Sequence, residues 1–508
     1  MGFQSILFAN SGQEAGKSVP AFFEDLKLDY LLKIIENQTK GYAVRHFYYT
    51  LPSSVSLIQY RQQICRDLSD KDLNSCIRRF CFLLQKSRLS YAFSLKCEET
   101  VQAASYHLKA ASLYWDSLLA FGRDLDSCSP SSEGILALRE YVRKHIANLQ
   151  EQNFGQEAAH ANEIFSQLKF RLTVEEERIV ITEEAEETED YLKELSALLR
   201  VDDIGQDCSF SGIFPNALEP SCLEETLVKL LKKSNAEVFR EMRNFKQQFP
   251  NFYAEKILRF EEEVQFYLGF LEFAEKTRVF GYPMELPHIL GQNDFSGTGV
   301  YDLALLWKNA SRAYTVVSNN FHWSQKPSFF VVTGPNQGGK TTFARSVGQA
   351  VYFAMMGLPV NVSSLELPFF EGIATHFEAE EKIQSNSGKL KEEINRLAPM
   401  MHQDKKHQFV ILNELFTTAT THDALIMGKK VMEHFLMREC YGIYVTHIQE
   451  LAEETDSIIS LVAQVEEGEE VKRTYRMLPM KAQGYGYSDS LVKLKWSMVF
   501  HCVYSAYS

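Results

Sequence analysis

A nine-residue segment, GPNQGGKTT at positions 334–342, constrains the fold of this 508-residue chain more than any other feature of its sequence. It fits the pattern G-x-x-x-x-G-K-[S/T] and lies between an apolar run, Phe329 to Thr333, and a helical pattern, Thr342 to Met356. In a strand, glycine-rich turn and helix of this kind, backbone N–H groups and the N-terminal end of the helix point at one anion. The segment therefore predicts a phosphate-binding loop at the centre of a nucleotide-binding domain.

The residues of this loop have separate expected roles in binding ATP and Mg2+. We expect the ammonium group of Lys340 to reach the β and γ phosphates, and the hydroxyl group of Thr341 to bind the metal ion. The residues expected to surround the nucleotide are Gly334, Pro335, Asn336, Gln337, Gly338, Gly339, Lys340, Thr341 and Thr342. The sequence thus predicts ATP and Mg2+ as cofactors.

A second segment, QFVILNEL at positions 408–415, contains four apolar residues followed by Asn413 and Glu414. The first of these two positions usually carries aspartate, whose charge holds a magnesium-bound water, whereas Asn413 offers only an uncharged oxygen. Glu414 remains well placed as the general base that orients the attacking water. We therefore expect Asn413 at the metal, Glu414 as a catalytic residue, and slow hydrolysis of ATP.

A third segment, YVTHIQE, places His447 directly after an apolar strand pattern at Gly442 to Val445. The carboxyl end of that strand lies at the sheet edge where the phosphates are expected, so His447 can sense the γ phosphate. A single histidine is more often structural. Its position after the other two segments nevertheless favours the catalytic interpretation.

Length and hydrophobic periodicity predict three parts in the chain. From about Pro20 to Arg123, apolar residues three and four apart predict a helical bundle. We then expect a helix at 135–168, a β-hairpin at 170–182, and helices at 223–249 and 253–278. From about residue 300, the runs SFFVVT, GIATHF, FVILNE and GIYVTH alternate with helical stretches, which is typical of a parallel sheet.

The expected fold class is therefore α plus α/β. Its domains are a helical domain at 1–125, a long-helix arm with a small β tip at 126–290, and a nucleotide-binding domain with a mostly parallel sheet at 291–508.

The net charge of −13 has the wrong sign for a protein that holds nucleic acid by its overall field, so any contact with DNA must be local. The expected helix at 223–249 offers one local candidate, since a basic stripe opposes an apolar face. The stripe comprises Lys229, Lys233, Arg240 and Arg243. A bundle helix with a solvated back explains the same pattern, and a surface that follows DNA phosphates is the sharper hypothesis.

Other features place the chain in a broad class. Its nine cysteines are odd in number and lack CxxC pairing, which favours reduced structural thiols over a zinc site or a disulfide framework. The first residues have no basic flank, and no apolar run is long enough to span a bilayer. We expect a cytoplasmic protein without a membrane segment.

Taken in order, the three segments resemble the ATPase domain of the MutS family of DNA mismatch repair proteins, an ABC-type P-loop NTPase. The loop matches the family's GPN, a variable residue and GGK[S/T], and MMGLPVNVSSLELPFFEGIATHF resembles its continuation. Asn413 and Glu414 fall on the family's Asp-Glu pair, Asp423 on the aspartate of its subunit-crossing loop, and His447 on its Thr-His pair.

The resemblance implies a homodimer through the ATPase domain, in which a serine of one subunit caps ATP on the other. In the segment IQSNSGKLKEEI the candidate is Ser387, although Gly388 and Lys389 replace the expected Thr-Phe. The segment FTTATTHDA likewise lacks the family's Gly-Arg-Gly.

The part before residue 300 resembles the family's core, lever and clamp region in kind. We expect no counterpart of the family's mismatch-reading domains in this sequence; the Phe-x-Glu spacing at Phe22 to Glu24 lies on a helical core pattern. The resemblance implies a nucleotide-gated clamp on duplex or branched DNA in repair or recombination, without sequence specificity. Two alternatives stay open, namely an ATP-dependent protein-binding switch that does not touch DNA and a pseudo-enzyme that only binds ATP.

Overall fold

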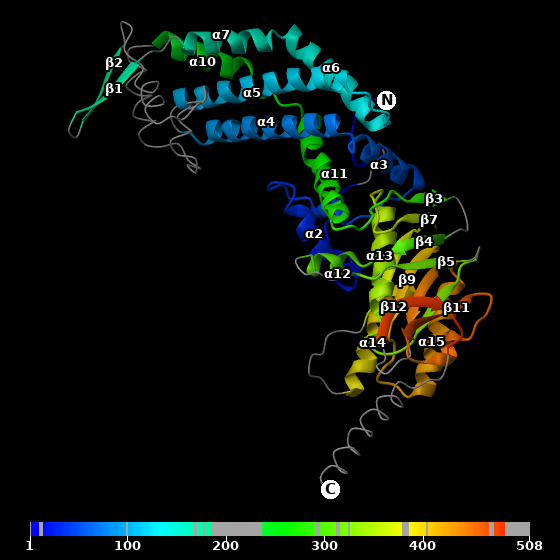
Figure 1. Ribbon diagram of the computed structural model, residues 1–508. Coiled ribbons are helices and arrows are strands. Elements are labelled where there is room, and N and C mark those ends of the chain that lie inside the picture. The colour runs from blue at the N-terminus through cyan, green and yellow to red at the C-terminus, as the bar shows by residue number, and fades with distance from the viewer. Residues whose placement is uncertain are drawn as a thin grey trace, which may run out of the picture. The chain divides into compact units, whose positions relative to one another are not determined.

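The structure, a computed structural model, describes residues 2–9, 14–97, 100–166, 170–175, 178–183, 236–290, 295–310, 315–323, 326–377, 386–402, 405–466 and 472–482 (Figure 1). The chain divides into two compact units that alternate along the sequence. The first unit comprises Met1–Phe3, Asp70–Ser131 and Ile135–Glu261, and the second comprises Gln4–Ser69, Ser132–Gly134 and Glu262–Ser508. The three domains expected at 1–125, 126–290 and 291–508 stay a prediction.

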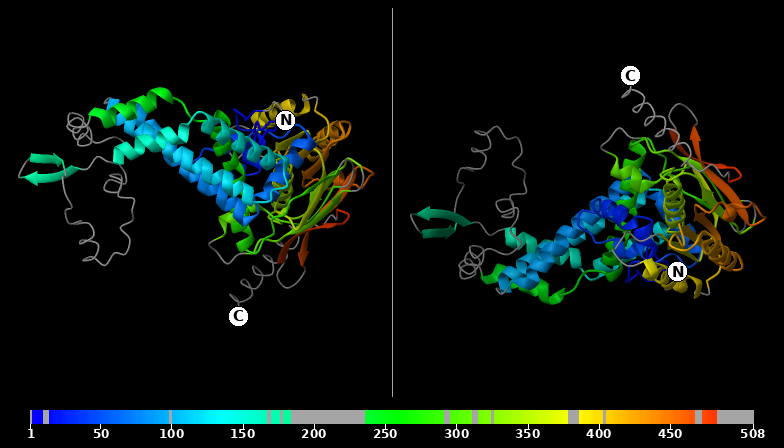
Figure 2. Two further views of the ribbon diagram at one scale, coloured as in Figure 1. Left: turned by 90° about the horizontal axis from the view of Figure 1, so that it is seen from above. Right: turned by 90° about the horizontal axis from the view of Figure 1, so that it is seen from below.

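The first unit is helical. Helices α4 (Lys71–Lys96) and α5 (Thr100–Ser127) lie side by side along their length in every view (Figures 1 and 2). The unit also contains helices α6 (Glu133–Glu151), α7 (Phe154–Ser166) and α10 (Ala236–Gln248). The ring of Phe154 lies 5.1–5.9 Å from the rings of Phe245, Phe249 and Phe252, so aromatic packing joins α7 to α10 and the segment after it.

One of the expected helices was wrong in extent. The pattern at 135–168 predicted a single helix, but the structure has two, because α6 ends at Glu151 and α7 begins at Phe154. Between them Asn153 adopts the left-handed conformation, with φ 59°, which asparagine tolerates better than most residues. The apolar periodicity continues across this turn, so the pattern alone did not reveal it.

The other elements expected in this region are confirmed where the structure describes them. Strands β1 (Phe170–Glu175) and β2 (Arg178–Glu183) form an antiparallel pair. Helix α10 confirms the second half of the helix expected at 223–249, whose first half lies outside the described residues. The helix expected at 253–278 is α11 (Glu255–Val279).

The second unit is built on a six-stranded sheet of order β12-β11-β6-β10-β9-β8. Only β12 runs antiparallel to its neighbour. Its strands are β6 (Phe329–Thr333), β8 (Gly372–His376), β9 (Gln408–Asn413), β10 (Tyr441–Val445), β11 (Ile458–Glu466) and β12 (Lys472–Pro479). The four strands read from the sequence are β6, β8, β9 and β10, so the expected mostly parallel sheet is confirmed.

Helices cover both faces of this sheet. On one face Val410 and Leu412 of β9 pack with α14 (Asn386–His402) and α15 (Thr421–Leu436). On the other face Ile411 contacts α13 (Lys340–Met355), where a Cβ atom at Gly348 would lie 2.7 Å from the Ile411 side chain. Fully buried on both faces, the central strands read as unbroken apolar runs, which is why the sequence revealed them.

A second, four-stranded sheet of order β3-β7-β4-β5 was not predicted. It comprises β3 (His288–Leu290), β7 (Ser364–Pro368), β4 (Phe295–Val300) and β5 (Asn319–Trp323). Phe295 stacks on Trp323 with ring centroids 4.4 Å apart, which anchors this sheet. The strands are short, and β4 contains two glycines, so their apolar alternation is weak.

The remaining elements of the second unit are α1 (Phe22–Asp25), α2 (Leu28–Glu36), η1 (Arg45–Tyr48), α3 (Val55–Asp67), α12 (Leu303–Lys308) and η3 (Gln449–Ala452). Phe23 is fully buried with its ring 5.5 Å from that of Tyr352 on α13. Its core position agrees with the helical pattern at Phe22 to Glu24. None of the described helices is both long enough and apolar enough to cross a lipid bilayer.

Candidate functional site

The glycine-rich loop joins the buried strand β6 to helix α13, as the sequence predicted. Gly334 has φ 127° and Gly339 has φ 90°, conformations that favour glycine. A Cβ atom on Gly334 would also lie only 2.9 Å from the Cβ atom of Ala463 on β11. Glycine is therefore required at position 334 both by the backbone and by the strand that packs against the loop.

Lys340 begins α13 and folds back over this loop. Its ammonium group donates hydrogen bonds to the carbonyl oxygens of Gly334, at 2.8 Å, and Pro335, at 3.2 Å. Burial lowers the pKa of Lys340, and the carboxylate of Glu414 raises it. A buried cation held by carbonyl groups alone is well suited to bind anionic phosphate oxygens, which compensate its charge.

Thr341 and Asn413, the two expected magnesium residues, lie next to each other. The hydroxyl group of Thr341 donates a 2.9 Å hydrogen bond to Oδ1 of Asn413, the last residue of β9. Both side chains present oxygen atoms, the ligands that Mg2+ prefers, but neither carries a charge. Among the described residues no group of three or more acidic, histidine or cysteine side chains forms a metal cluster. The site therefore suits a magnesium ion that takes most of its ligands from phosphate and water.

Glu414 and His447 were predicted separately, and the structure brings their side chains together. The register of β9 and β10 sets Asn413 opposite Val445, so the residues after both strands meet at one sheet edge. The backbone N–H of Glu414 donates to the carbonyl of Val445 at 2.8 Å. Nε2 of His447 hydrogen-bonds to the Glu414 carboxylate at 3.0 Å. The pair can hold and orient a carboxylate beside the phosphate-binding loop.

The loop opens into a cavity of about 470 Å³, a size that fits a small ligand. Its polar lining includes residues of the loop, Lys340 among them, and Glu414. The lining also includes side chains that are apolar or aromatic, namely Leu305, Val316, Val317 and Tyr475. Sequence reasoning missed these four residues, because they come from separate segments and form no pattern together.

A comparison with models of protein families is consistent with this mostly parallel sheet and its glycine-rich loop. Residues 330–488 match the family model MutS domain V. This part of the chain is a MutS domain V. The domain is an ATPase domain of the ABC type, and proteins of the MutS family dimerise through it.

Curated relatives match the chain over a limited part of their length. The chain is 29% identical over 205 residues to DNA mismatch repair protein MSH6 of Arabidopsis thaliana, covering 38% of this chain and 15% of that protein. It is 29% identical over 137 residues to DNA mismatch repair protein MutS of Thermotoga sp. (strain RQ2), covering 27% and 17%. It is 30% identical over 161 residues to DNA mismatch repair protein msh-3 of Neurospora crassa, covering 31% and 14%. The matches thus span less than a fifth of each relative.

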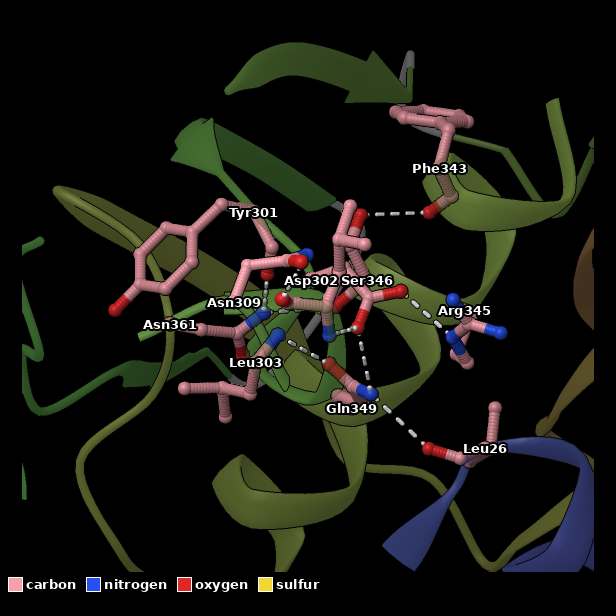
Figure 3. A network of polar contacts seen from close by, with 11 residues as sticks. Leu26, Tyr301, Asp302, Leu303, Asn309, Phe343, Arg345, Ser346, Gln349 and Asn361 are labelled. Atoms are coloured by element: carbon pink, nitrogen blue, oxygen red, sulfur yellow. Dashed lines mark hydrogen bonds and ion pairs between the residues drawn. The ribbon is translucent and has the colours of Figure 1, made fainter. Parts of the chain in front are cut away.

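Figure 3 shows a buried polar network between α13 and the segments that carry Leu26 and Asp302. Asp302 caps α12 by accepting the N–H of Leu305 at 3.0 Å, and it pairs with Arg345 of α13 at 2.6 Å. Gln349, one turn further along α13, donates to Asp302 at 3.3 Å and to the carbonyl of Leu26 at 3.0 Å. Because Leu305 lines the cavity, these bonds tie the cavity wall to the helix that carries Lys340.

The two residues expected at the subunit boundary of a MutS domain V are only partly described. Ser387 lies in the first turn of α14, and its side chain lies outside the described part of the structure. Asp423 lies in the exposed first turn of α15, where its carboxylate accepts a 2.7 Å hydrogen bond from Thr420. Asp423 is not among the described residues that line the cavity of its own chain. Their expected roles stay predictions.

The basic stripe belongs to the helical unit and is described in part. Lys229 and Lys233 fall outside the described residues, whereas Arg240 and Arg243 lie on α10. Arg240 forms ion pairs with two glutamates of its own helix, Glu237 at 3.1 Å and Glu241 at 3.6 Å. The opposite face buries Phe239, Met242 and Phe245, as the expected apolar seam requires.

Proposed function

We propose that this chain binds ATP with Mg2+ in the 470 Å³ cavity, hydrolyses the ATP, and uses this cycle to control binding to DNA. The observation that carries the proposal is the meeting of Lys340, the Thr341–Asn413 pair and the Glu414–His447 pair at one sheet edge. ATP turnover and ATP binding, measured for the parent chain beside variants of Lys340 and Glu414, test it. Equal turnover in the parent and in the variants would indicate a pseudo-enzyme that binds ATP without hydrolysing it.

Each polar group of the site has a specific role in this proposal. Lys340 and the backbone of residues 334–342 hold the phosphates, and Thr341 with Asn413 binds the metal. Magnesium supplies charge neutralisation on the phosphate oxygens. Glu414 accepts the proton of the attacking water, and His447 holds the Glu414 carboxylate in position through the 3.0 Å hydrogen bond.

The apolar and aromatic side chains in the cavity lining suit the base of the nucleotide. Leu305, Val316 and Val317 offer aliphatic contact, and the phenol ring of Tyr475 offers a flat surface for an aromatic ring. A Cβ atom on Gly339 would meet Tyr475 at 3.3 Å, so the ring lies directly beside the phosphate-binding loop. Base and phosphate contacts therefore fall within one continuous cavity.

The replacement of aspartate by Asn413 is expected to raise the Mg2+ requirement. An Asn413→Asp variant should reach half-maximal ATP turnover at about tenfold lower Mg2+, since a carboxylate adds net attraction of roughly 1.4 kcal/mol for the ion. The measurement is the initial rate of phosphate release across a Mg2+ titration. The matched control is Asn251→Asp, which makes the same change at an exposed residue far from Asn413 in the sequence. An unchanged or higher Mg2+ requirement in Asn413→Asp would remove Asn413 from the metal site.

We further propose that the chain acts as a homodimer through its MutS domain V, with Ser387 of one subunit near the nucleotide of the other. The support is the dimerisation common to the family and the place of Ser387 at the start of α14. Sedimentation of the parent chain with and without a non-hydrolysable ATP analogue tests this assembly. A monomer under both conditions contradicts it.

Binding to duplex or branched DNA is the proposed output, supported by the names of the relatives and by the basic stripe on the helical unit. Reversal of Lys229, Lys233, Arg240 and Arg243 to glutamate is expected to abolish binding. Where residual binding is measurable at low salt, the slope of log K against log salt should shrink by roughly three to four, since each phosphate contact contributes about 0.9. Fluorescence anisotropy with homoduplex and four-way-junction DNA at two or more salt concentrations measures both effects.

The matched control reverses four exposed lysines of the second unit, Lys405, Lys406, Lys429 and Lys430, which gives the same net charge. DNA binding that both variants lose equally would reflect net charge and not the stripe. The specific alternative is an ATP-dependent switch that binds a protein. It is favoured by the ion pairs that Arg240 forms with Glu237 and Glu241 and by the net charge of −13. Parent protein that binds no DNA at low salt would support that alternative.

A further inference from the structure

The loop that carries Glu414 has an unusual backbone conformation. Glu414 has φ 54° and Phe416 has φ 61°, so two residues that are not glycine lie in the left-handed region within one turn. Such residues are strained and persist only where the surroundings hold them. The side chains of Leu415 and Phe416 are buried in the core between the sheet, α14 and α15, which fixes one side of this loop.

Two hydrogen bonds hold the backbone of the loop. The N–H of Glu414 donates to the Val445 carbonyl at 2.8 Å, within the sheet. The N–H of Phe416 donates to the carboxylate of Glu393, on α14, at 2.7 Å. The second bond is short and charge-assisted, and it comes from a side chain two turns into α14, a helix that also packs on the sheet through Leu397. Glu393 therefore stabilises the left-handed turn at Phe416, two residues after Glu414.

We propose that Glu393 is a positioning residue that sets the place of the Glu414 carboxylate. Without Glu393 the partly buried N–H of Phe416 loses its hydrogen-bond acceptor. The strained turn is then no longer held in place and can relax. Relaxation at Phe416 moves the backbone of Glu414 two residues away and disturbs the 3.0 Å contact with His447. This inference rests on the proposed ATP hydrolysis, because it assigns to Glu393 an effect on turnover through Glu414.

Helix α14 gives the interaction a second consequence. The helix begins at Asn386, beside Ser387, and Glu393 follows two turns later on the same rigid element. A shift of the helix start therefore reaches the Glu414 loop through the Glu393 carboxylate, as well as through the apolar cluster that α14 shares with Leu415 and Phe416. Occupation of the α14 start by a ligand or a second subunit would thus alter turnover without contact to Glu414.

The test compares Glu393→Ala with Glu393→Gln, which keeps a hydrogen-bond acceptor. We expect kcat for ATP to fall about tenfold or more in Glu393→Ala, while the affinity for a non-hydrolysable ATP analogue changes less than twofold. Glu393→Gln should recover most of the turnover. Glu392→Ala, on the exposed neighbour, is the control and should match the parent. Should Glu393→Ala not melt cooperatively, Glu393→Asp replaces it, because it withdraws the carboxylate by one methylene.

A double-mutant cycle separates positioning from general damage. In a Glu414→Gln background, Glu393→Ala should have no further effect on residual turnover, because it acts only through Glu414. Equal additional loss in that background overturns the inference. So does a parallel loss of analogue binding, or full turnover in Glu393→Ala. The proposed hydrolysis fails by a different result, namely parent turnover equal to that of Lys340→Met and Glu414→Gln.

Discussion

Glu414→Gln is expected to lower ATP turnover by about 10²- to 10⁴-fold while ATP binding persists. The amide keeps the size of the side chain and can still accept a hydrogen bond, but it cannot take a proton from water, which is the contribution of a general base. Its place supports this role, since the carboxylate lines the cavity beside the loop and hydrogen-bonds to His447 at 3.0 Å. Phosphate release under single-turnover conditions measures the loss, and equilibrium binding of a fluorescent ATP analogue measures retention.

The control for this variant is Glu453→Gln, which makes the same chemical change at an exposed residue after η3. It should match the parent in both assays. A Glu414→Gln variant with near-parental turnover would require another base. A variant that loses nucleotide binding as well would indicate that the Glu414 carboxylate organises the cavity and does not act only in the chemical step.

Lys340→Met is expected to remove most nucleotide binding. The ammonium group is buried, its pKa is lowered by that burial, and it is aimed into the loop by the carbonyls of Gly334 and Pro335. Loss of one partner from a desolvated charge pair costs about 2–5 kcal/mol, which corresponds to roughly 30- to 5,000-fold in affinity. The fold should survive, because methionine fills the space and removes a charge that is costly to bury.

Thermal unfolding with and without ATP and Mg2+ measures this effect. At 100 times its Kd, ATP should stabilise the parent by about 2.7 kcal/mol, whereas a 100-fold weaker variant gains only about 0.4 kcal/mol at the same concentration. Lys429→Met, on the exposed surface of α15, is the matched control and should keep the full ATP-dependent shift. A Lys340→Met variant with the parental shift would place the phosphates elsewhere.

The parts of the site that the sequence revealed are those with a local signature. The loop at 334–342 has fixed spacing, and β6, β9 and β10 are buried on both faces, so each appears as an apolar run. Polar residues directly after such strands must meet at one sheet edge, which made Glu414 and His447 predictable as neighbours of the loop. Their mutual hydrogen bond was not predictable, since it depends on side-chain directions after two separate strands.

The apolar part of the cavity lining had no local signature. Leu305, Val316 and Tyr475 each look like ordinary core or surface residues, and only the packing of distant segments makes them neighbours. The same limit applies to Asp302 and Arg345, which pair across 43 positions of the chain. The stability of such a network depends on tertiary contacts, which no short window of sequence contains.

Hydrophobic periodicity also could not predict which helices pack together in one compact unit. A 3.6-residue pattern shows that a helix has an apolar face but not what that face packs against. Residues 4–69 belong to the same compact unit as the ATPase domain, where Tyr48 accepts a hydrogen bond from Tyr352 of α13 at 2.6 Å. Arg61, fully buried, reaches the carbonyl of Met356 just beyond the end of the same helix. The predicted capping residue Ser387 and the stripe residues Lys229 and Lys233 await experiment.

The hairpin of β11 and β12 lies beside the glycine-rich loop and adds Tyr475 to the lining of the cavity. Ala463 packs against the glycine-rich loop, and the backbone around Tyr475 bonds to Asn319 through its carbonyl and through the N–H of Met477. During synthesis the loop leaves the ribosome long before these residues do. A nascent chain therefore cannot present a finished cavity until the hairpin has folded, and the proposed binding of ATP would selectively stabilise chains that have completed this last step.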